Sequence, residues 1–513
     1  MDIRPQIANL KKLPQKQPEA AQGEPINVSA ATRRIAFAYE RFRNTLEPDE
    51  ADILRRKAIV RILERRLEEN RPYKVCAEQI LQELIRANYI PPVTTAAVPP
   101  VALYLEKIQY IRRHLDANLA EWFLKLAAVS IDRMFFPGSF QESQVSLMYQ
   151  DVFSRIEWVD NLVDPKDQPT QTYMACHRTL FESDDHEIAY HYFIHYFPEW
   201  HAPSVTDQSL NRIVQDLPEF RRKLMESLHH PARERLTRLF RPVAVPYRII
   251  GDILRQTGEE SLADSEKLAA SVIAAMDQRS QKLRASMGKR AWHSIVFLFF
   301  TKTLLALLLE VPYELLAVST VHWLALGVNV AFHPLLLIFL TLSVRLPGQD
   351  NTAKVVEQVH KIVTGIGELP TIIIRKPRRY GAATWTVFAL FYIVLFLVIF
   401  WSLFTLLGLM QFSLVAMFMF VIFLGLVSFL AMRIRRSVNQ IRLIPAKEGA
   451  LGIMFTFLSL PILEFGRWLA QNIQQLNVFL FFMDRILEAP FKILIDIIEE
   501  WFDFVRDRQE EIT

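Results

Sequence analysis

Two long, almost uncharged stretches constrain the fold of this chain more than any other feature. Residues 295–344 contain only three charged side chains, Lys302, Glu310 and Glu314, and residues 381–432 contain none. Each stretch is about fifty residues long, whereas one helix that crosses a bilayer needs about 20 apolar residues. Because a helix of a soluble core would not stay uncharged over such a length, each stretch predicts two membrane-spanning helices joined by a turn.

We therefore expect two transmembrane hairpins, at 291–345 and 381–432. Their turns are expected near Ser319 and near Gly408–Gln411. Glycine is scarce (15 residues) and phenylalanine abundant (36 residues), which suits lipid-facing helices better than a β architecture. The predicted fold class is all-α, with a soluble helical N-terminal domain, polytopic transmembrane helices and a C-terminal amphipathic helix.

Lysine and arginine flank both hairpins and are absent from their turns. Because cytoplasmic flanks of transmembrane helices carry an excess of these residues, the turns are expected outside and both chain termini in the cytoplasm. The predicted location is the cytoplasmic (inner) membrane, with the lipid bilayer as a partner. The flanking residues are Lys282, Arg284, Lys289 and Arg290, then Arg345, Lys354, Lys361, Arg375, Lys376, Arg378 and Arg379, then Arg433, Arg435, Arg436, Arg442 and Lys447.

The N-terminal half has the polar composition and helical spacing of a soluble domain. Residues 1–30 lack an apolar run and are expected to form a disordered tail. Apolar side chains three to four residues apart predict a helical subdomain over 31–90 and a cytosolic helical domain over 101–290. The proline-rich segment 91–100 is expected to be a linker between them. Helices of the larger domain are expected near 101–134, 145–162, 168–197, 207–229, 231–256 and 262–288.

Three more segments separate or follow the hairpins. Residues 346–380 predict a cytosolic loop with an amphipathic helix, lying either on the membrane or on protein. Residues 449–470 are apolar but include a proline and two charged residues, and predict a re-entrant or interfacial segment. Residues 475–508 have the pattern of a long amphipathic helix whose acidic face suits a basic protein surface better than anionic lipid.

Composition and motifs exclude several function classes. The net charge of +4 gives no concentrated basic face, so no nucleic acid is expected as a partner. Cys76 and Cys176 form no CxxC pattern, and a reducing compartment is the default. The sequence contains no Walker A loop, GxGxxG, HExxH or GxSxG element, so we expect no cofactor and no enzymatic activity.

The first hairpin holds the polar side chains that could carry a membrane activity, because charges at membrane depth are costly and usually face a cavity or a partner. One interpretation is an ion pathway, in which carboxylates bind a cation or relay a proton. The alternative is structural: Lys302 extends to the cytoplasmic interface, Glu314 lies near the outer turn, and Glu310 bonds to another helix or subunit. The pathway candidates are Glu310, Glu314, Lys302, His322, Asn329 and His333.

Histidines cluster in the soluble half, between His177 and His201. His191 and His195 are four residues apart, a spacing at which one helix face can chelate a metal. The same stretch is rich in tyrosine and phenylalanine, and the alternative is an aromatic packing helix with no metal. Both interpretations stay open from the sequence.

Several segments resemble a pattern found in uncharacterised multi-pass membrane proteins of small-genome candidate-phylum bacteria. This resemblance implies a bacterial inner-membrane setting, and no activity is attached to that family. The segments are Thr301–Glu314 (TKTLLALLLEVPYE), Leu324–Pro334 (LALGVNVAFHP), Arg345–Thr352 (RLPGQDNT), Ala87–Pro91 and Arg241–Pro246.

The expected function is that of a non-enzymatic, membrane-anchored scaffold or assembly protein. It would display the cytosolic helical domain to a protein partner or form a homo-oligomer. The first alternative is a small oligomeric channel or a proton or cation transporter that uses Glu310. The second is a metal-dependent cytosolic domain at the His177–His201 cluster.

Overall fold

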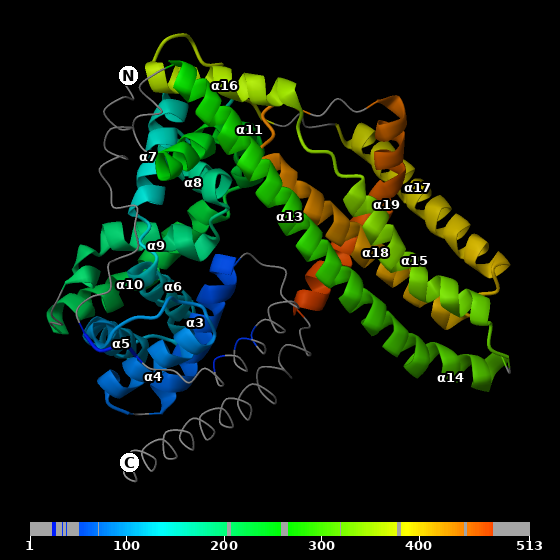
Figure 1. Cartoon of the computed structure of the whole chain (residues 1–513), viewed down its shortest axis with the longest axis horizontal. Coiled ribbons are helices and arrows are strands. Elements are labelled where there is room, and N and C mark those ends of the chain that lie inside the picture. Colours follow the sequence, from blue (N-terminus) through cyan, green and yellow to red (C-terminus); the bar gives the residue numbers. More distant parts are fainter. Residues whose placement is uncertain are drawn as a thin grey trace, which may run out of the picture. The chain divides into compact units, whose positions relative to one another are not determined.

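A computed structural model describes most of the chain, and the all-α prediction is confirmed (Figure 1). The predicted tail over 1–30, except 23–26, and nearly all of the predicted amphipathic helix over 475–508 lie outside the described residues. The described residues are 23–26, 33, 37, 40, 51–69, 71–202, 207–257, 265–318, 320–376, 381–445 and 449–475. They divide into two compact units, one reaching to Phe240 and including Pro370–Ile374, the other formed by Arg241–Leu369 and the residues from Arg375 onward.

The first unit is built from short helices that follow one another closely. Its helices are α3 (Ala51–Glu68), α4 (Tyr73–Arg86), η1 (Thr95–Ala97), α5 (Val98–Arg113), α6 (Ala117–Phe135), α7 (Ser139–Ser154), α8 (Gln168–Phe181), α9 (Asp185–Tyr196), η2 (Pro198–His201), α10 (Asp207–Leu228) and the first part of α11 (Arg233–Gln256). Within this unit α3 packs on α6, α4 on α5, α6 on α9 and α7 on α8.

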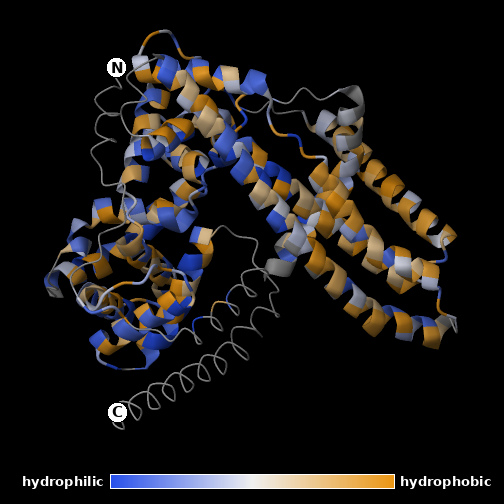
Figure 2. Ribbon diagram, in the orientation of Figure 1, coloured by the Kyte–Doolittle hydropathy of each residue, from blue (hydrophilic) through white to orange (hydrophobic). Residues whose placement is uncertain are grey.

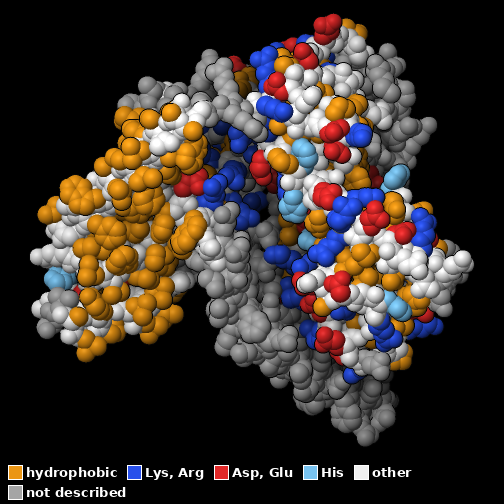
Figure 3. Space-filling view, turned by 180° about the vertical axis from the view of Figure 1, so that it is seen from behind, with side chains coloured by type: hydrophobic (Ala, Val, Ile, Leu, Met, Phe, Trp, Pro, Cys, Tyr) orange, Lys and Arg blue, Asp and Glu red, His pale blue; other side chains and the backbone are white. Residues whose placement is uncertain are grey.

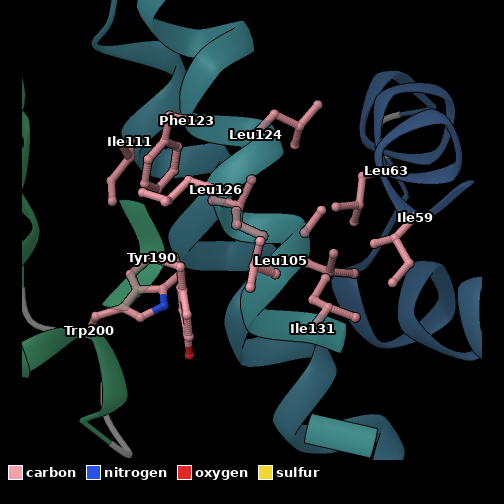
Figure 4. Packing of buried hydrophobic residues seen from close by; sticks show 14 of the residues in the cluster. Ile59, Leu63, Leu105, Ile111, Phe123, Leu124, Leu126, Ile131, Tyr190 and Trp200 are labelled. Atoms are coloured by element: carbon pink, nitrogen blue, oxygen red, sulfur yellow. The ribbon is translucent and has the colours of Figure 1, made fainter. Parts of the chain in front are cut away.

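One hydrophobic core joins most of these helices. Phe123, Phe193 and Trp200 are fully buried and stack edge to face, with ring centroids 5.6–6.0 Å apart. Figure 4 shows Trp200 and Tyr190 beside Phe123 of α6, and Leu63 of α3 on the other side of the same helix. The core includes residues from both sides of the proline-rich segment 91–100. The aromatic character of 190–200 is therefore used for packing.

The proline-rich segment is not entirely a linker. Its last residues, Val98–Pro100, form the first turn of α5. Proline is accepted there because the first amide groups of a helix have no partner within the helix, so the missing N–H costs nothing. The segment expected to be a linker is thus helical from Thr95 onward, through η1 and the first turn of α5.

A short two-stranded parallel sheet, unexpected from the sequence, also belongs to the first unit. β1 (Ile156–Trp158) pairs with β2 (Ile372–Ile374), and Ile156 lies opposite Ile372. The Arg155 side chain donates a hydrogen bond to the carbonyl of Pro370, next to the strand (2.9 Å). Three-residue strands this far apart in sequence leave no alternating pattern that could have predicted them.

The second unit contains the long apolar helices. Its elements are the rest of α11, α13 (Ser265–Leu305), η3 (Ala306–Glu310), α14 (Val311–Tyr313), η4 (Glu314–Val318), α15 (Trp323–Leu342), α16 (Gln349–Thr364), α17 (Ala382–Leu409), α18 (Leu414–Arg436), η5 (Ser437–Gln440) and α19 (Ala450–Gln475). The helix expected to end near residue 288 does not end there. α13 runs on to Leu305, because no proline interrupts it.

Four helices of the described chain are long and apolar enough to cross a membrane, at Glu266–Ala317, Trp323–Leu342, Ala382–Leu409 and Leu414–Gln440. In Figure 2 the ribbons of α15, α17, α18 and the second part of α13 are largely hydrophobic, and Figure 3 shows a broad surface of exposed hydrophobic side chains. α17 exposes the most, including Trp385, Phe391 and Trp401. Such an extent of exposed apolar surface is typical of a membrane-embedded or partner-covered region.

The amphipathic helix expected in the 346–380 loop is α16. Its apolar side chains Val355, Val359 and Ile362 are buried, and the helix packs on α13. The helix begins after Gly348, and the side chain of Asn351 in its first turn binds the chain at 441–444.

α19 lies along α18 and also contacts α17. The contact with α18 depends on two glycines, because a Cβ atom on Gly466 would overlap the backbone of Gly425. Residues 449–470, predicted to be re-entrant or interfacial, lie almost entirely within this single helix. The prediction for this segment stays a prediction, since no membrane plane is defined.

Candidate functional site

The polar side chains of the first predicted hairpin gather in a buried cluster between α13, η3 and α15. Lys302 and Glu310 are each 1 % exposed, and Asn329 and His333 are 0 % exposed. Phe420 and Phe423 of α18 form the apolar side of the cluster. Four of the six pathway candidates thus lie close together.

Wide helical turns help to bring these residues together. Eight residues of regular α-helix separate Lys302 from Glu310 and would turn Glu310 about 80° away from Lys302. η3 is a π-helical turn, and its wider i→i+5 hydrogen bonding advances fewer degrees per residue. The turn therefore reduces the offset, and both side chains point toward α15. A second π-helical turn, η4, begins at Glu314, just beyond Pro312.

Lys302 and His333 form the inner pair of the cluster. The ammonium group of Lys302 lies 2.5 Å from Nδ1 of His333, and Nε2 of His333 lies 2.9 Å from the carbonyl oxygen of Phe420. A carbonyl can only accept, so Nε2 carries a proton of the ring. Nδ1 lies 3.3 Å from the backbone carbonyl oxygen of Asn329 but closer to the ammonium group of Lys302, from which it accepts. His333 is therefore neutral in this arrangement, and Lys302 also lies over the rings of Phe420 and Phe423, 5.4 and 5.1 Å from their centroids.

This geometry differs from the structural interpretation of Lys302. A lysine that snorkels would extend its ammonium group to the helix end and into solvent. Lys302 instead turns its ammonium group inward to His333.

Glu310 and Asn329 form the second pair. The Asn329 amide group donates a hydrogen bond to Oε1 of Glu310 (2.6 Å). This is the inter-helix bond that the structural interpretation expected for Glu310. The other atoms of the two groups, Oε2 of Glu310 and Oδ1 of Asn329, are buried and have no hydrogen-bond partner among the residues that the structure describes. The pair is therefore only half satisfied.

Glu314 and His322 lie apart from the first four residues, at the turn between η4 and α15. Oε2 of the buried Glu314 accepts a hydrogen bond from the backbone N–H of His322 (2.9 Å), just before α15 begins. The imidazole Nδ1 of His322 is 3.9 Å from the same oxygen. This contact joins η4 to the residue just before α15.

The histidines of the first unit are arranged differently from a chelating pair. His191 is buried, and its Nδ1 lies 3.2 Å from a carboxylate oxygen of Glu142, while His195, one turn later, is exposed. His191 stacks on His177 with ring centroids 4.6 Å apart. Burial holds the pKa of His177 well below its ordinary value, and nearby positive charges lower it further. Among the described residues, no group of three or more His, Cys, Asp or Glu side chains could hold a metal ion.

The residues of the polar cluster were predictable from the sequence, but some of the groups that they contact were not. The Phe420 carbonyl and the two phenylalanines of α18 come from the predicted second hairpin, which contains no charged residue. Glu142, the partner of His191, lies 49 residues earlier than His191 in the chain. Neither contact has a local sequence signal, because each depends on how distant helices pack.

No family model matches this chain, and no curated protein or solved structure is similar to it at a significant level.

Proposed function

We propose that this chain is an integral protein of the cytoplasmic membrane that crosses the bilayer as two helical hairpins. In this proposal the N-terminal helical unit lies in the cytoplasm and acts as a non-enzymatic scaffold or assembly domain. The observation that supports the proposal is the set of four apolar, membrane-length helices in one half of the chain. Apolar helices of this length are rarely found in soluble domains.

The distribution of charge supports the proposed orientation. Basic residues lie before the apolar end of α13, between α15 and α17, and in the last turn of α18. The connections between η4 and α15 and between α17 and α18 contain no lysine or arginine. By the positive-inside rule, these two connections face outward.

Ion pairs in the first unit support a structural role for its buried charges. Arg55 bonds to Asp132 across the α3–α6 contact, and Arg66 bonds to Glu83 between α3 and α4. Arg56 bonds to Asp184, the residue that caps α9 (2.9 Å). Buried ion pairs of this kind fix how helices pack, and removal of one partner leaves an uncompensated charge.

The scaffold proposal is tested with the full chain in mild detergent. Native mass spectrometry of the purified protein, and of material isolated from its own membranes, is expected to show a defined homo-oligomer or one stoichiometric protein partner. A monomer with no partner under both conditions contradicts the proposal.

A second function, a proton or cation pathway through Glu310, is favoured by the buried polar cluster. Ionisable groups within membrane helices are costly and usually serve transport or pair with one another. Glu310 has a carboxylate oxygen with no partner among the described residues. Four spans are few for a transporter, so this function would require an oligomer.

Liposome flux measurements test this second function. The reconstituted chain is expected to pass protons or a monovalent cation, and Glu310→Gln is expected to abolish the flux. Glu464→Gln is the matched control, because Glu464 is a half-exposed carboxylate on α19 that pairs with Arg467 (2.7 Å) outside the cluster. Absence of flux, or equal flux through wild type and Glu310→Gln, rejects the pathway.

A further inference from the structure

The Glu310–Asn329 pair lacks the hydrogen atom that a second hydrogen bond between the two side chains would need. Its two side chains are joined by a single bond, from Nδ2 of Asn329 to Oε1 of Glu310 (2.6 Å). The remaining atoms, Oε2 of Glu310 and Oδ1 of Asn329, are both acceptors, and both are buried with no hydrogen-bond partner in the part of the chain that the structure describes. Leaving a buried polar atom unpaired costs about 1–3 kcal/mol, and more for a charged group. A single donor between the two oxygens would satisfy both.

Among the described residues, no group donates a hydrogen bond to either oxygen. Lys302 of α13 is bound to His333, and the Nε2–H of His333 donates to the carbonyl of Phe420. Glu314, the nearest other carboxylate, can only accept and is bound to the backbone of His322. α18 contributes aromatic rings to this part of the cluster.

The Glu310 carboxyl group is also not paired with the buried ammonium group, because Lys302 is bound to His333 and Glu310 is bound to Asn329. An unpaired buried carboxylate takes up a proton more readily than it remains charged.

We infer that Glu310 carries a proton on Oε2 and donates it to Oδ1 of Asn329, so that the two side chains form a cyclic acid–amide pair. One proton is taken from water, one O–H bond forms, the carboxylate becomes a neutral carboxylic acid, and no electrons are transferred. The pair then has two hydrogen bonds in opposite directions. The inference rests on the site of the second proposed function but requires no transport.

A proton fits this place better than a metal cation. Two oxygens suffice for one hydrogen bond, whereas hard cations such as Ca²⁺ or Mg²⁺ require about six or more oxygen ligands. The described residues offer no metal-holding group at this position. Bound sodium remains a measurable outcome, and it contradicts the inference.

Infrared difference spectroscopy of the full chain in lipid tests the inference. At neutral pH the wild-type protein is expected to show the C=O stretch of a protonated carboxylic acid, shifted by deuterium exchange, and Glu310→Gln is expected to remove this band. Asn329→Ala is expected to move it to higher frequency, because the Glu310 carbonyl loses its hydrogen bond from Nδ2. Glu464→Gln, the control on α19, should leave the band unchanged.

Two results overturn the inference: a band that Glu310→Gln does not change, or carboxylate bands that depend on sodium rather than on the proton. Loss of folding is not expected for Glu310→Gln, because the glutamine amide presents a donor where the acid carries its proton. Asn329→Ala provides a second, independent readout. If the band is present but liposomes show no flux, the protonated pair stands and the transport function fails.

Discussion

The imidazole of His177 is buried, and its Nε2 atom has no hydrogen-bond partner among the described residues. Burial, followed by the charges of His191 and nearby arginines, holds its pKa well below the ordinary value of about 6.5. Below pH 6.5 the unfolded chain binds a proton at this position that the folded chain does not bind. The free energy of unfolding that depends on neutral His177 is therefore at its full value above about pH 6.5. It decreases as the pH falls below that value, by up to about 1.4 kcal/mol per pH unit.

His177→Gln tests this pH dependence. Glutamine does not titrate, so we expect a smaller loss of stability between pH 7 and pH 5 than in the wild type. Burial also lowers the pKa of His186 and of His201, so part of the loss remains. The measurement is hydrogen exchange of α8 and α9 amides across a urea titration of the full chain. His195→Gln, at an exposed position, is the control. If the stability of His177→Gln falls between pH 7 and pH 5 as much as that of the wild type, the prediction is contradicted.

Asn351 is a second residue with a clear stability role. Its Nδ2 donates to the carbonyl of Ile441 (2.9 Å), and its Oδ1 accepts from the backbone N–H groups of Leu443 (2.8 Å) and Ile444 (3.1 Å). Asn351→Ala leaves three backbone groups without this partner, and we expect a loss of about 2 kcal/mol or more. Faster hydrogen exchange at 441–445 would report it. Asn472→Ala, which removes one bond to the Trp468 carbonyl on its own helix, should have a smaller effect.

At the scale of elements, α18 and α19 approach each other through Gly425 and Gly466. A Cβ on Gly466 meets the Gly425 backbone, which cannot move aside as a flexible side chain can. Gly466→Ala is expected to cost about 1–3 kcal/mol through overpacking and to lower the thermal midpoint in detergent. Gly327→Ala is the matched control on α15, since its added Cβ meets nothing within 4 Å. Alanine there should be neutral or stabilising by up to about 1 kcal/mol. Equal midpoints for both variants would show that the glycine contact is not needed.

The elements also show what the sequence can and cannot predict. The length of an uncharged stretch is a property of one segment, so the apolar helices α15, α17 and α18 were predictable. The candidates Glu310 and Asn329 were predictable as polar residues at membrane depth, but not as partners. Their contact depends on the wide turn η3 and on the packing of α15, and neither feature leaves a periodic pattern. The β1–β2 pair was missed for a similar reason, since its strands are more than 200 residues apart and three residues long.

At the scale of the whole molecule, the proposed topology predicts opposite exposure for two sets of loops. The connections at Thr320 and Gln411 are expected outside, and the segment around Glu368 is expected in the cytoplasm, because basic residues surround only the latter. All three side chains are exposed. The native Cys76 and Cys176 are buried, and burial raises the pKa of both thiols, so the folded chain should react little with a thiol reagent.

Single cysteines at these three positions test the topology. In intact cells a membrane-impermeant maleimide is expected to label Thr320→Cys and Gln411→Cys, while Glu368→Cys should react only after permeabilisation. The unsubstituted chain measures the background of the two native thiols. Labelling of all three positions from the same side contradicts the two-hairpin arrangement. If the reagent labels only Glu368→Cys in intact cells, the hairpins have the opposite orientation. The helical unit would then lie outside the cytoplasm, where the proposed scaffold function could not operate.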